Sequence, residues 1–398
     1  MLYLSLQDPN YRIKGSRDPL GFQPVWQRLG RTIIQHLSTV SVNVRDFQVM
    51  SFAYYLYGDD DPKQFLDFFY KWEQLCAYAR ENDDTIKDGY NGKNFVTKTM
   101  LTNPDGTYYI STKNEDTLLS NQKAYGVYGK YNRPYTEMKI RKQDDFIEVM
   151  TDAVDRCSQK ERIYSIVQRI LGDLRARDEI RTKITPEDLD AVAELFQNLA
   201  PMERKFYDRL ILQGDEEHNQ NELYRLLEQK EELLTTDGPF ELYNVLQTFI
   251  SDGLTSETLR QQLEEIHHAE KLLYIYINLF RHIQSRPIWS NAEIQAEEAV
   301  LSIPKVASYN YKDEVLQRVS NTLTTDRDHT VHDVVDRNKE ICKKRNNAAW
   351  LELDGDKIRR HYQEGGRELK EWNVEEYFEN DYFIAAYFRL YKQIKLGQ

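Results

Sequence analysis

The chain contains little cysteine and no complete catalytic motif. Its 398 residues include three widely spaced cysteines, Cys76, Cys157 and Cys342, and none of them forms a CxxC pair. An odd number of distant cysteines argues against a disulfide framework, and nothing near them indicates an activating histidine. We therefore expect buried, reduced thiols.

Phosphate-binding and nucleophile motifs are absent as well. Without a Walker-type loop, GxGxxG or GxSxG, the sequence excludes a P-loop ATPase, a Rossmann enzyme and an α/β-hydrolase. No apolar run approaches the roughly 20 residues of a membrane helix, and the N-terminus lacks the pattern of a signal peptide. We expect a cytoplasmic protein without a membrane segment, and no cofactor is indicated.

The net charge of -12 is spread unevenly. Residues 213–271 hold four Lys/Arg against fourteen Asp/Glu, so this stretch alone accounts for -10. Such an acidic middle repels nucleic acid, and any nucleic-acid contact must lie elsewhere. The balance of 40% hydrophobic and 30% charged residues is that of a globular chain.

Aromatic residues concentrate in a few helical segments. Val44–Tyr57 and Lys63–Arg80 are apolar around most of their circumference, which predicts a buried αα-hairpin. The hairpin is either the centre of an N-terminal domain or a surface that docks a partner, and we favour the core. A last helix within residues 377–391 is similarly rich in Tyr and Phe.

Strand patterns are limited to one segment. Two runs rich in β-branched and aromatic residues flank Asn103-Pro104-Asp105-Gly106, which predicts a β-hairpin near residues 94–112. After residue 143 the periodicity is helical, including a heptad-like helix over 259–280. The expected fold is mainly α and multi-helical. Its two to three helical domains are divided as 1–145, 146–302 and 303–398.

The strongest candidate binding segment is Gln122–Lys142, with six Lys/Arg, one Glu and four interleaved tyrosines. Aromatic faces stack on bases while cations follow phosphates, so this composition suits a loop that binds a single strand or the nucleic-acid backbone. A surface segment packed on the protein body is the other interpretation. The candidate residues are Lys123, Tyr125, Tyr128, Lys130, Tyr131, Arg133, Tyr135, Lys139, Arg141 and Lys142.

A second candidate is catalytic. Residues 327–332 match Arg, a polar residue, three more residues and His. This pattern resembles the short motif of HEPN-type RNases, which are also helical. The resemblance implies that His332 would transfer a proton during RNA cleavage and that Arg327 would stabilise charge on the phosphate.

Two acidic patterns are weaker. Glu264-Glu265-Ile266-His267-His268 contains Glu-x-x-His twice, but a di-iron bundle needs a matching motif, and only Asp215-x-x-His218 is available. We therefore expect a solvated helix face and no metal. The acids and lysine of Glu352–Lys357 are nuclease-like, but no strand context is evident, so we interpret them as a turn.

The opening block resembles a group of bacterial proteins. It looks like the start of poorly characterised helical proteins encoded in anti-phage defence clusters. This resemblance implies a role beside other subunits, often nucleases or helicases, and transfers no catalytic residue. The residues that carry it are Asp18-Pro19-Leu20-Gly21, Trp26, Gly30-Arg31, Ser38-Thr39-Val40-Ser41 and Val44-Arg45-Asp46-Phe47.

The sequence thus favours a non-enzymatic subunit of a multi-protein bacterial defence assembly. We expect its aromatic helices to bind other protein subunits of the same operon and residues 122–142 to contact DNA or RNA. A HEPN-like RNase using Arg327 and His332 is the first alternative. A scaffold that binds only protein is the second.

Overall fold

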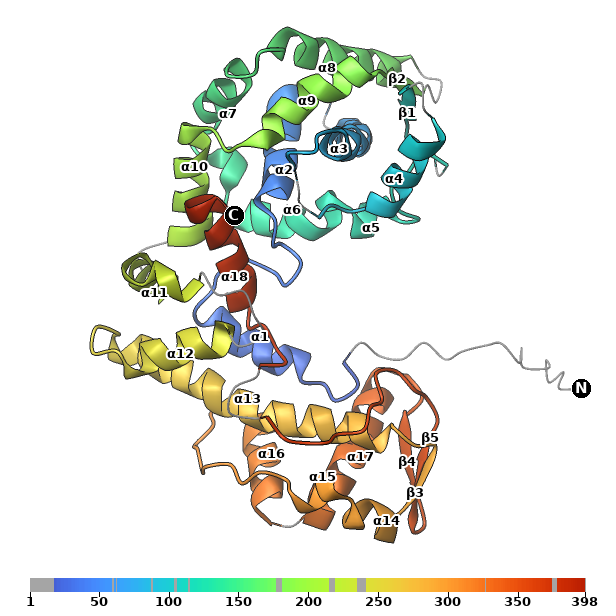
Figure 1. Cartoon of the computed structure of the whole chain (residues 1–398), viewed down its shortest axis with the longest axis vertical. Helices are drawn as coiled ribbons and strands as arrows, with labels where there is room; N and C mark the ends of the chain where they lie inside the picture. The colour runs from blue at the N-terminus through green and yellow to red at the C-terminus, as the bar shows by residue number, and fades with distance from the viewer. Residues whose placement is uncertain are drawn as a thin grey trace, which may run out of the picture. The chain divides into compact units, whose positions relative to one another are not determined.

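The structure is a computed structural model of the chain. It describes residues 18–58, 61, 63–86, 89–103, 106–113, 115–176, 181–214, 219–234, 241–325, 327–373 and 378–397, with the backbone alone at 324–325 and 327–328. Within these ranges the protein is mainly α-helical with short antiparallel strands (Figure 1). The predicted fold class is therefore confirmed.

The chain forms two compact units, each assembled from two separate stretches. Unit 1 comprises residues 1–33 and 225–382, and unit 2 comprises residues 34–224 and 383–398. The boundaries predicted at 145 and 302 coincide with none of the points where the chain passes from one unit to the other. Composition does not reveal these points, because the return of the last residues to unit 2 depends on long-range packing.

Unit 2 is built around the predicted αα-hairpin. Helix α2 spans Val44–Tyr57 and α3 spans Phe65–Asn82, so both predicted helices are confirmed. In Figure 1, α3 is seen end-on, with α2, α9 and α4 packed around it. The other elements of unit 2 are α4 (Lys93–Thr102), β1 (Tyr108–Ile110), α5 (Gln122–Tyr125), α6 (Val127–Glu137), η1 (Ile140–Lys142), α7 (Phe146–Asp155), α8 (Lys160–Arg175), β2 (Thr182–Ile184), α9 (Pro186–Gln197), α10 (Pro201–Tyr207), η2 (Asp208–Gln213), α18 (Ile384–Tyr391) and η4 (Lys392–Leu396).

The hairpin forms the core of this unit and not a free docking face. Phe47, Phe68 and Trp72 are completely buried, as are most other side chains of α2 and α3. A buried ion pair joins the two helices, with Nη1 of Arg80 2.7 Å from Oδ1 of Asp46. Only the side chains near the α2–α3 turn and a few along the edges remain partly exposed.

The β-hairpin predicted near residues 94–112 is wrong. Residues 93–102 form α4, in which Thr99 and Thr102 donate their hydroxyl protons back to the carbonyls of Phe95 and Lys98. These bonds satisfy the threonines within a helix despite their preference for strands. Strand β1 exists, but it pairs antiparallel with β2, far along the chain.

Unit 1 is organised along the long helix α13 (Glu257–Ile283), which confirms the heptad-like helix predicted over 259–280. Helices α1, α12, α16 and α17 pack against it, and Figure 1 shows α12 beside it. Its other elements are α1 (Gln23–Arg31), η3 (Glu231–Leu234), α12 (Glu241–Ser251), β3 (Ile288–Ser290), α14 (Asn291–Ala296), α15 (Glu298–Leu301), α16 (Glu314–Thr325), α17 (Arg327–Lys344), β4 (Leu351–Asp354) and β5 (Lys357–Arg360). Helix α11 (Asn219–Gln229) contains the passage from unit 2 to unit 1.

Glu270 is a buried polar residue of α13, at a position where the heptad-like row of apolar residues is interrupted. Its carboxylate accepts hydrogen bonds from the amide of Glu379 at 2.5 Å and the hydroxyl of Tyr382 at 2.7 Å. Burial raises the pKa of Glu270 to about 7. This residue therefore ties the segment after residue 378 to the long helix.

The aromatic side chains of the last helix are almost completely buried. In α18, Tyr387, Phe388 and Tyr391 are almost completely buried within unit 2, which corrects the predicted docking role. Tyr377, the first aromatic residue predicted for this helix, lies outside the described residues.

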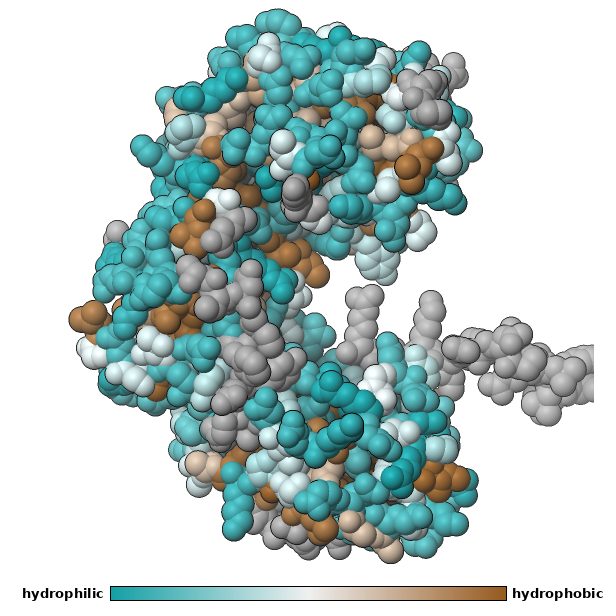
Figure 2. Space-filling view, in the orientation of Figure 1, coloured by the Kyte–Doolittle hydropathy of each residue, from teal (hydrophilic) through white to brown (hydrophobic). Residues whose placement is uncertain are grey.

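Figure 2 shows hydrophilic residues over most of the visible surface, with hydrophobic residues in small groups. Among the described helices, none is both long and apolar enough to cross a membrane.

Candidate functional site

The basic, tyrosine-rich segment is helical and not a loop. Residues 122–142 form α5, α6 and η1, which lie against the α2–α3 hairpin in unit 2. Tyr125 is 53% exposed, and Lys123 and Arg133 are also exposed. Lys130 is half-buried and donates a hydrogen bond to Asn91, whereas Arg133 pairs with Glu137 on the same helix. These four residues therefore lie along the outer side of the segment.

Two of the predicted stacking residues are unavailable to a ligand. Tyr131 is 1% exposed and Tyr135 is 2% exposed. The Tyr131 hydroxyl accepts a hydrogen bond from the amide of Asn43 at 3.0 Å, and the Tyr135 hydroxyl donates to Ser51 at 3.3 Å. The prediction that Tyr131 and Tyr135 stack on bases is wrong, because both rings belong to the core of unit 2.

The two glycines of the segment serve close packing. A Cβ at Gly129 would collide with the backbone carbonyl of Ala124, and a Cβ at Gly126 would meet Oε1 of Glu73 at 2.7 Å. That Glu73 oxygen accepts a hydrogen bond from the amide of Val127 at 2.7 Å. Burial raises the pKa of Glu73 to about 7. The glycines thus let α5 and α6 approach each other and α3.

A row of partly exposed aromatic rings lies beside this segment. The ring of Tyr54, near the end of α2, stacks on Phe65 at the start of α3 with centroids 4.4 Å apart. Its other neighbour is the buried Tyr135, at 5.4 Å. Tyr128 of α6 lies edge-to-face against Phe69 at 5.4 Å. Tyr54, Phe65 and Tyr128 are each half-buried, so part of each ring remains accessible.

A guanidinium completes this row. Cζ of Arg141, in η1, lies 4.9 Å from the centroid of the Tyr54 ring. Burial raises the pKa of Tyr54 to about 12, while the positive charge of Arg141 opposes that rise. The phenol therefore stays neutral at physiological pH, so the Arg141 guanidinium lies beside an uncharged aromatic stack.

Two further cations flank Arg141. Lys139 and Lys142 are exposed, and among the described residues no carboxylate lies within ion-pair distance of Lys139, Arg141 or Lys142. Lys139 has a φ of 53°, the left-handed conformation that ends α6 and turns the chain into η1. This turn places Arg141 over Tyr54. We call Tyr54, Phe65, Tyr128, Lys139, Arg141 and Lys142 the Tyr54 surface.

Sequence reasoning missed Tyr54 and Phe65 as surface residues. Both lie in helices interpreted as core, and only their positions at the α2–α3 turn leave them partly exposed. A signal was available for Tyr128, Tyr131 and Tyr135, because their spacing of three and four residues places them on one face of a helix. That spacing would have indicated an inward face, had the segment been taken as helical.

The HEPN-like motif lies at the start of α17 in unit 1. His332 is half-buried, and the side chain of Arg327 lies outside the described residues. Five residues along an α-helix correspond to a rotation of about 140° around its axis. Positions 327 and 332 therefore do not share a face of α17.

In the described part of the chain, the acidic sequence patterns do not form a group of metal ligands. No group of three or more potential ligands occurs there, and the segment containing Asp215 and His218 lies outside it. The turn expected within 352–357 is present at residues 355–356, but the expected absence of strands beside it is wrong, because β4 and β5 pair around it. Their charges are matched across the hairpin, with Nε of Arg359 2.6 Å from Oδ2 of Asp354.

No protein-family model, curated protein or solved structure matches the chain. The resemblance of residues 18–47 to defence proteins therefore remains a hypothesis. The geometry of the Tyr54 surface is the basis for the functional proposal.

Proposed function

We propose that this protein is a non-enzymatic, cytoplasmic subunit of a bacterial defence assembly and binds single-stranded nucleic acid through the Tyr54 surface. The observation that carries the proposal is the stack of Tyr54 on Phe65 with Arg141 over its ring. Tyr54, Phe65 and Tyr128 are each partly accessible. Aromatic rings stack on bases of any sequence, and adjacent cations neutralise phosphates. Lys139 and Lys142 supply those cations without a carboxylate partner in the described residues.

A salt titration tests the nucleic-acid part of the proposal. Labelled single- and double-stranded DNA and RNA are titrated with the wild type and with a variant carrying Lys139→Glu, Arg141→Glu and Lys142→Glu. Binding should favour single strands. The slope of log K against log salt should flatten by about 2–3 in the variant, because each phosphate contact contributes about 0.7–0.9.

A charge-matched variant controls for the overall change in net charge. Lys183, Lys305 and Lys343 are exposed cations outside the Tyr54 surface, and their replacement by glutamate alters the total charge equally. This control should retain most of the affinity. Equal loss in both variants, or no loss in either, would remove the Tyr54 surface from the proposal.

The probes are then analysed on a denaturing gel. Intact probes are expected for a recognition subunit. RNA cleavage that His332→Ala abolishes, while the variant stays folded, would favour the HEPN-like alternative instead.

The assembly part of the proposal rests on the resemblance of the N-terminal block. Proteins encoded beside this chain should co-purify with it when they are expressed together. Failure to recover any stable complex would contradict a subunit role. Recovery of a complex without nucleic-acid affinity would favour the scaffold alternative.

A further inference from the structure

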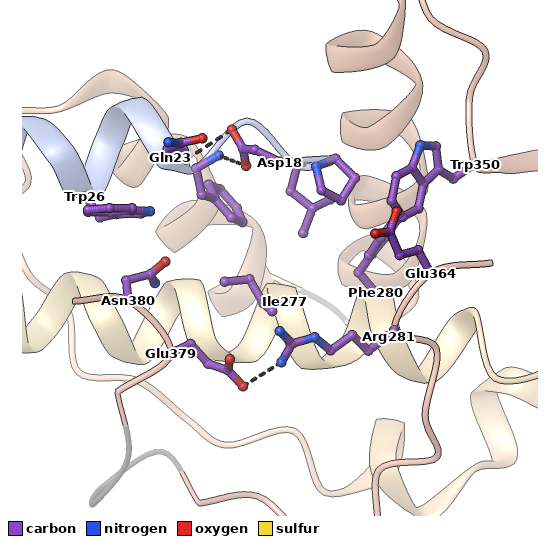
Figure 3. A pocket seen from close by; sticks show the side chains of 14 residues that line it. Asp18, Gln23, Trp26, Ile277, Phe280, Arg281, Trp350, Glu364, Glu379 and Asn380 are labelled. Carbon is purple, nitrogen blue, oxygen red and sulfur yellow. Dashed lines mark hydrogen bonds and ion pairs between the residues drawn. The ribbon is translucent and has the colours of Figure 1, made fainter. Parts of the chain in front are cut away.

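Unit 1 contains a cavity of about 380 Å³ that no part of the proposed function uses. It lies between the start of α1, the second half of α13 and the loops around residues 364 and 379 (Figure 3). Its volume is in the range of sites that hold a small ligand or one large side chain. All its lining residues belong to unit 1.

The walls of this cavity are aromatic. Phe22, Trp26, Phe280 and Trp350 line it, and each is at least nine-tenths buried behind the cavity surface. Trp350 is held by an edge-to-face contact with Tyr362, at a centroid distance of 4.7 Å. These rings provide flat, preformed surfaces for a planar or aliphatic group.

The charged groups that line the cavity are mainly acidic. Among the described lining residues, Asp18, Glu364 and Glu379 are acidic and Arg281 is the one cation. Asp18 is already engaged, because its carboxylate accepts hydrogen bonds from the amides that begin α1 and pairs with Arg345. Glu364 is exposed at the rim.

Glu379 is engaged through only one of its two oxygens. Its side chain is only 10% exposed, and Oε1 accepts hydrogen bonds from Nη1 of Arg281 at 2.6 Å and Nη2 of Arg367 at 3.4 Å. Asn278 also donates to Oε1, at 3.3 Å. Among the described residues nothing donates to Oε2, so one oxygen of a nearly buried carboxylate lacks a donor. Oε2 is not among the fully buried polar atoms without a partner, so a donor that enters the cavity can reach it.

We propose that this cavity binds the arginine side chain of a partner polypeptide. A guanidinium has two apolar faces that stack on indole rings and an edge of N–H donors that matches a carboxylate. Its methylene stem would pack on Phe22 and Phe280, its faces on Trp26 or Trp350, and its donors on Oε2 of Glu379. Glu364 at the rim adds a second acceptor.

The same electrostatics disfavour nucleic acid in this cavity. A nucleobase would fit the aromatic walls, but its phosphates would meet the carboxylates of Asp18 and Glu364. The cavity therefore offers a protein contact in unit 1, whereas the Tyr54 surface offers a nucleic-acid contact in unit 2. The two proposals use different residues and can fail separately.

The test uses the full chain and capped peptides of Gly and Ser with one central arginine. An otherwise identical peptide carries citrulline, which has the same shape without the charge. Calorimetry should show binding of the arginine peptide, with the citrulline peptide weaker by about tenfold or more. Glu379→Gln and Glu364→Gln should each weaken the arginine peptide, and Glu379→Gln should have the larger effect.

Glu371→Gln is the matched control, since Glu371 is an exposed carboxylate outside the cavity lining. It should leave peptide affinity unchanged. Glu364→Gln keeps the test valid if Glu379→Gln disturbs folding. Equal affinity for both peptides, or no response to either cavity variant, would overturn the proposal. Loss of oligonucleotide binding in the cavity variants would instead assign the site to a base.

Discussion

The guanidinium of Arg141 in η1 lies over the ring of Tyr54 at the end of α2, with Cζ 4.9 Å from the ring centroid. On one side, Tyr54 stacks on Phe65. On the other side, Arg141 lies in the chain between the exposed residues Lys139 and Lys142. The contact therefore joins the two kinds of group that single-stranded nucleic acid needs, one for its bases and one for its phosphates.

Removal of the Tyr54 ring should separate stacking from charge. We expect Tyr54→Leu to weaken single-strand binding by about 1–3 kcal/mol, the contribution of one stacked base, with little change in the salt slope. Tyr109→Leu is a matched control, because Arg181 lies over the Tyr109 ring at 5.5 Å outside the Tyr54 surface. Fluorescence anisotropy at several salt concentrations measures both quantities. A steep change in slope for Tyr54→Leu would contradict a stacking role.

The buried pair of Arg80 and Asp46 should be essential for the stability of unit 2. Asp46→Asn leaves the Arg80 charge buried without its counter-ion, so we expect a loss of about 3–5 kcal/mol in the free energy of unfolding. Glu137→Gln, which breaks the exposed pair with Arg133, should cost about 0–1 kcal/mol. Urea unfolding followed by circular dichroism compares the two variants. Similar losses in both would show that burial does not set the cost.

A larger side chain at Gly129 should destabilise the protein. Gly129→Ala brings a methyl group onto the carbonyl of Ala124, and relief of that collision should cost about 1–3 kcal/mol. Gly172 offers the opposite case, because a methyl group there meets nothing within 4 Å in α8. Gly172→Ala should therefore stabilise the protein by about 0.5–1 kcal/mol. Thermal or urea unfolding measures the change in stability of both variants. Unchanged stability in Gly129→Ala would show that α5 can shift.

Three buried carboxyls should make the protein less stable as the pH rises from about 7 to about 8. Burial raises the pKa of Glu203 to about 8 and those of Glu73 and Glu270 to about 7. The folded state therefore keeps these protons to a higher pH than the unfolded chain does. The stabilisation is complete below the unfolded pKa and is lost through the folded values, at up to about 1.4 kcal/mol per pH unit for each group.

Glu203→Gln tests this pH dependence directly. An amide cannot ionise, so the variant should show a shallower fall in the free energy of unfolding over the same pH range. Glu148→Gln, a substitution at an exposed carboxyl of α7, should leave the slope unchanged. The measurements are made above the ordinary pKa of histidine, because burial lowers the pKa of His282. At lower pH this histidine makes the protein more stable as the pH rises, which is opposite to the effect of the carboxyls. If the free energy of unfolding falls with pH at the same rate in the wild type and in Glu203→Gln, this carboxyl is not a source of the pH dependence.

Local signals in the sequence were sufficient for many helices and insufficient for the strands. The aromatic segments Val44–Tyr57 and Lys63–Arg80 correspond to α2 and α3, and the heptad pattern over 259–280 corresponds to α13. In contrast, β1 finds its partner in β2, and α4 replaces the predicted first strand of a hairpin. Pairing between distant segments leaves no trace in a short window, because its stabilisation comes from contacts that only the folded chain makes.

The sequence by itself determined the mainly helical class, the αα-hairpin of α2 and α3, and the concentration of positive charge in residues 122–142. Each of these depends on periodicity or composition within one segment. Only the tertiary structure decided that Tyr131 and Tyr135 are buried while Tyr54 and Phe65 are partly exposed. It also brought Glu379 beside Trp26 and Trp350 in one cavity of unit 1. The physical reason is that exposure and proximity depend on how distant segments pack, which no local pattern encodes.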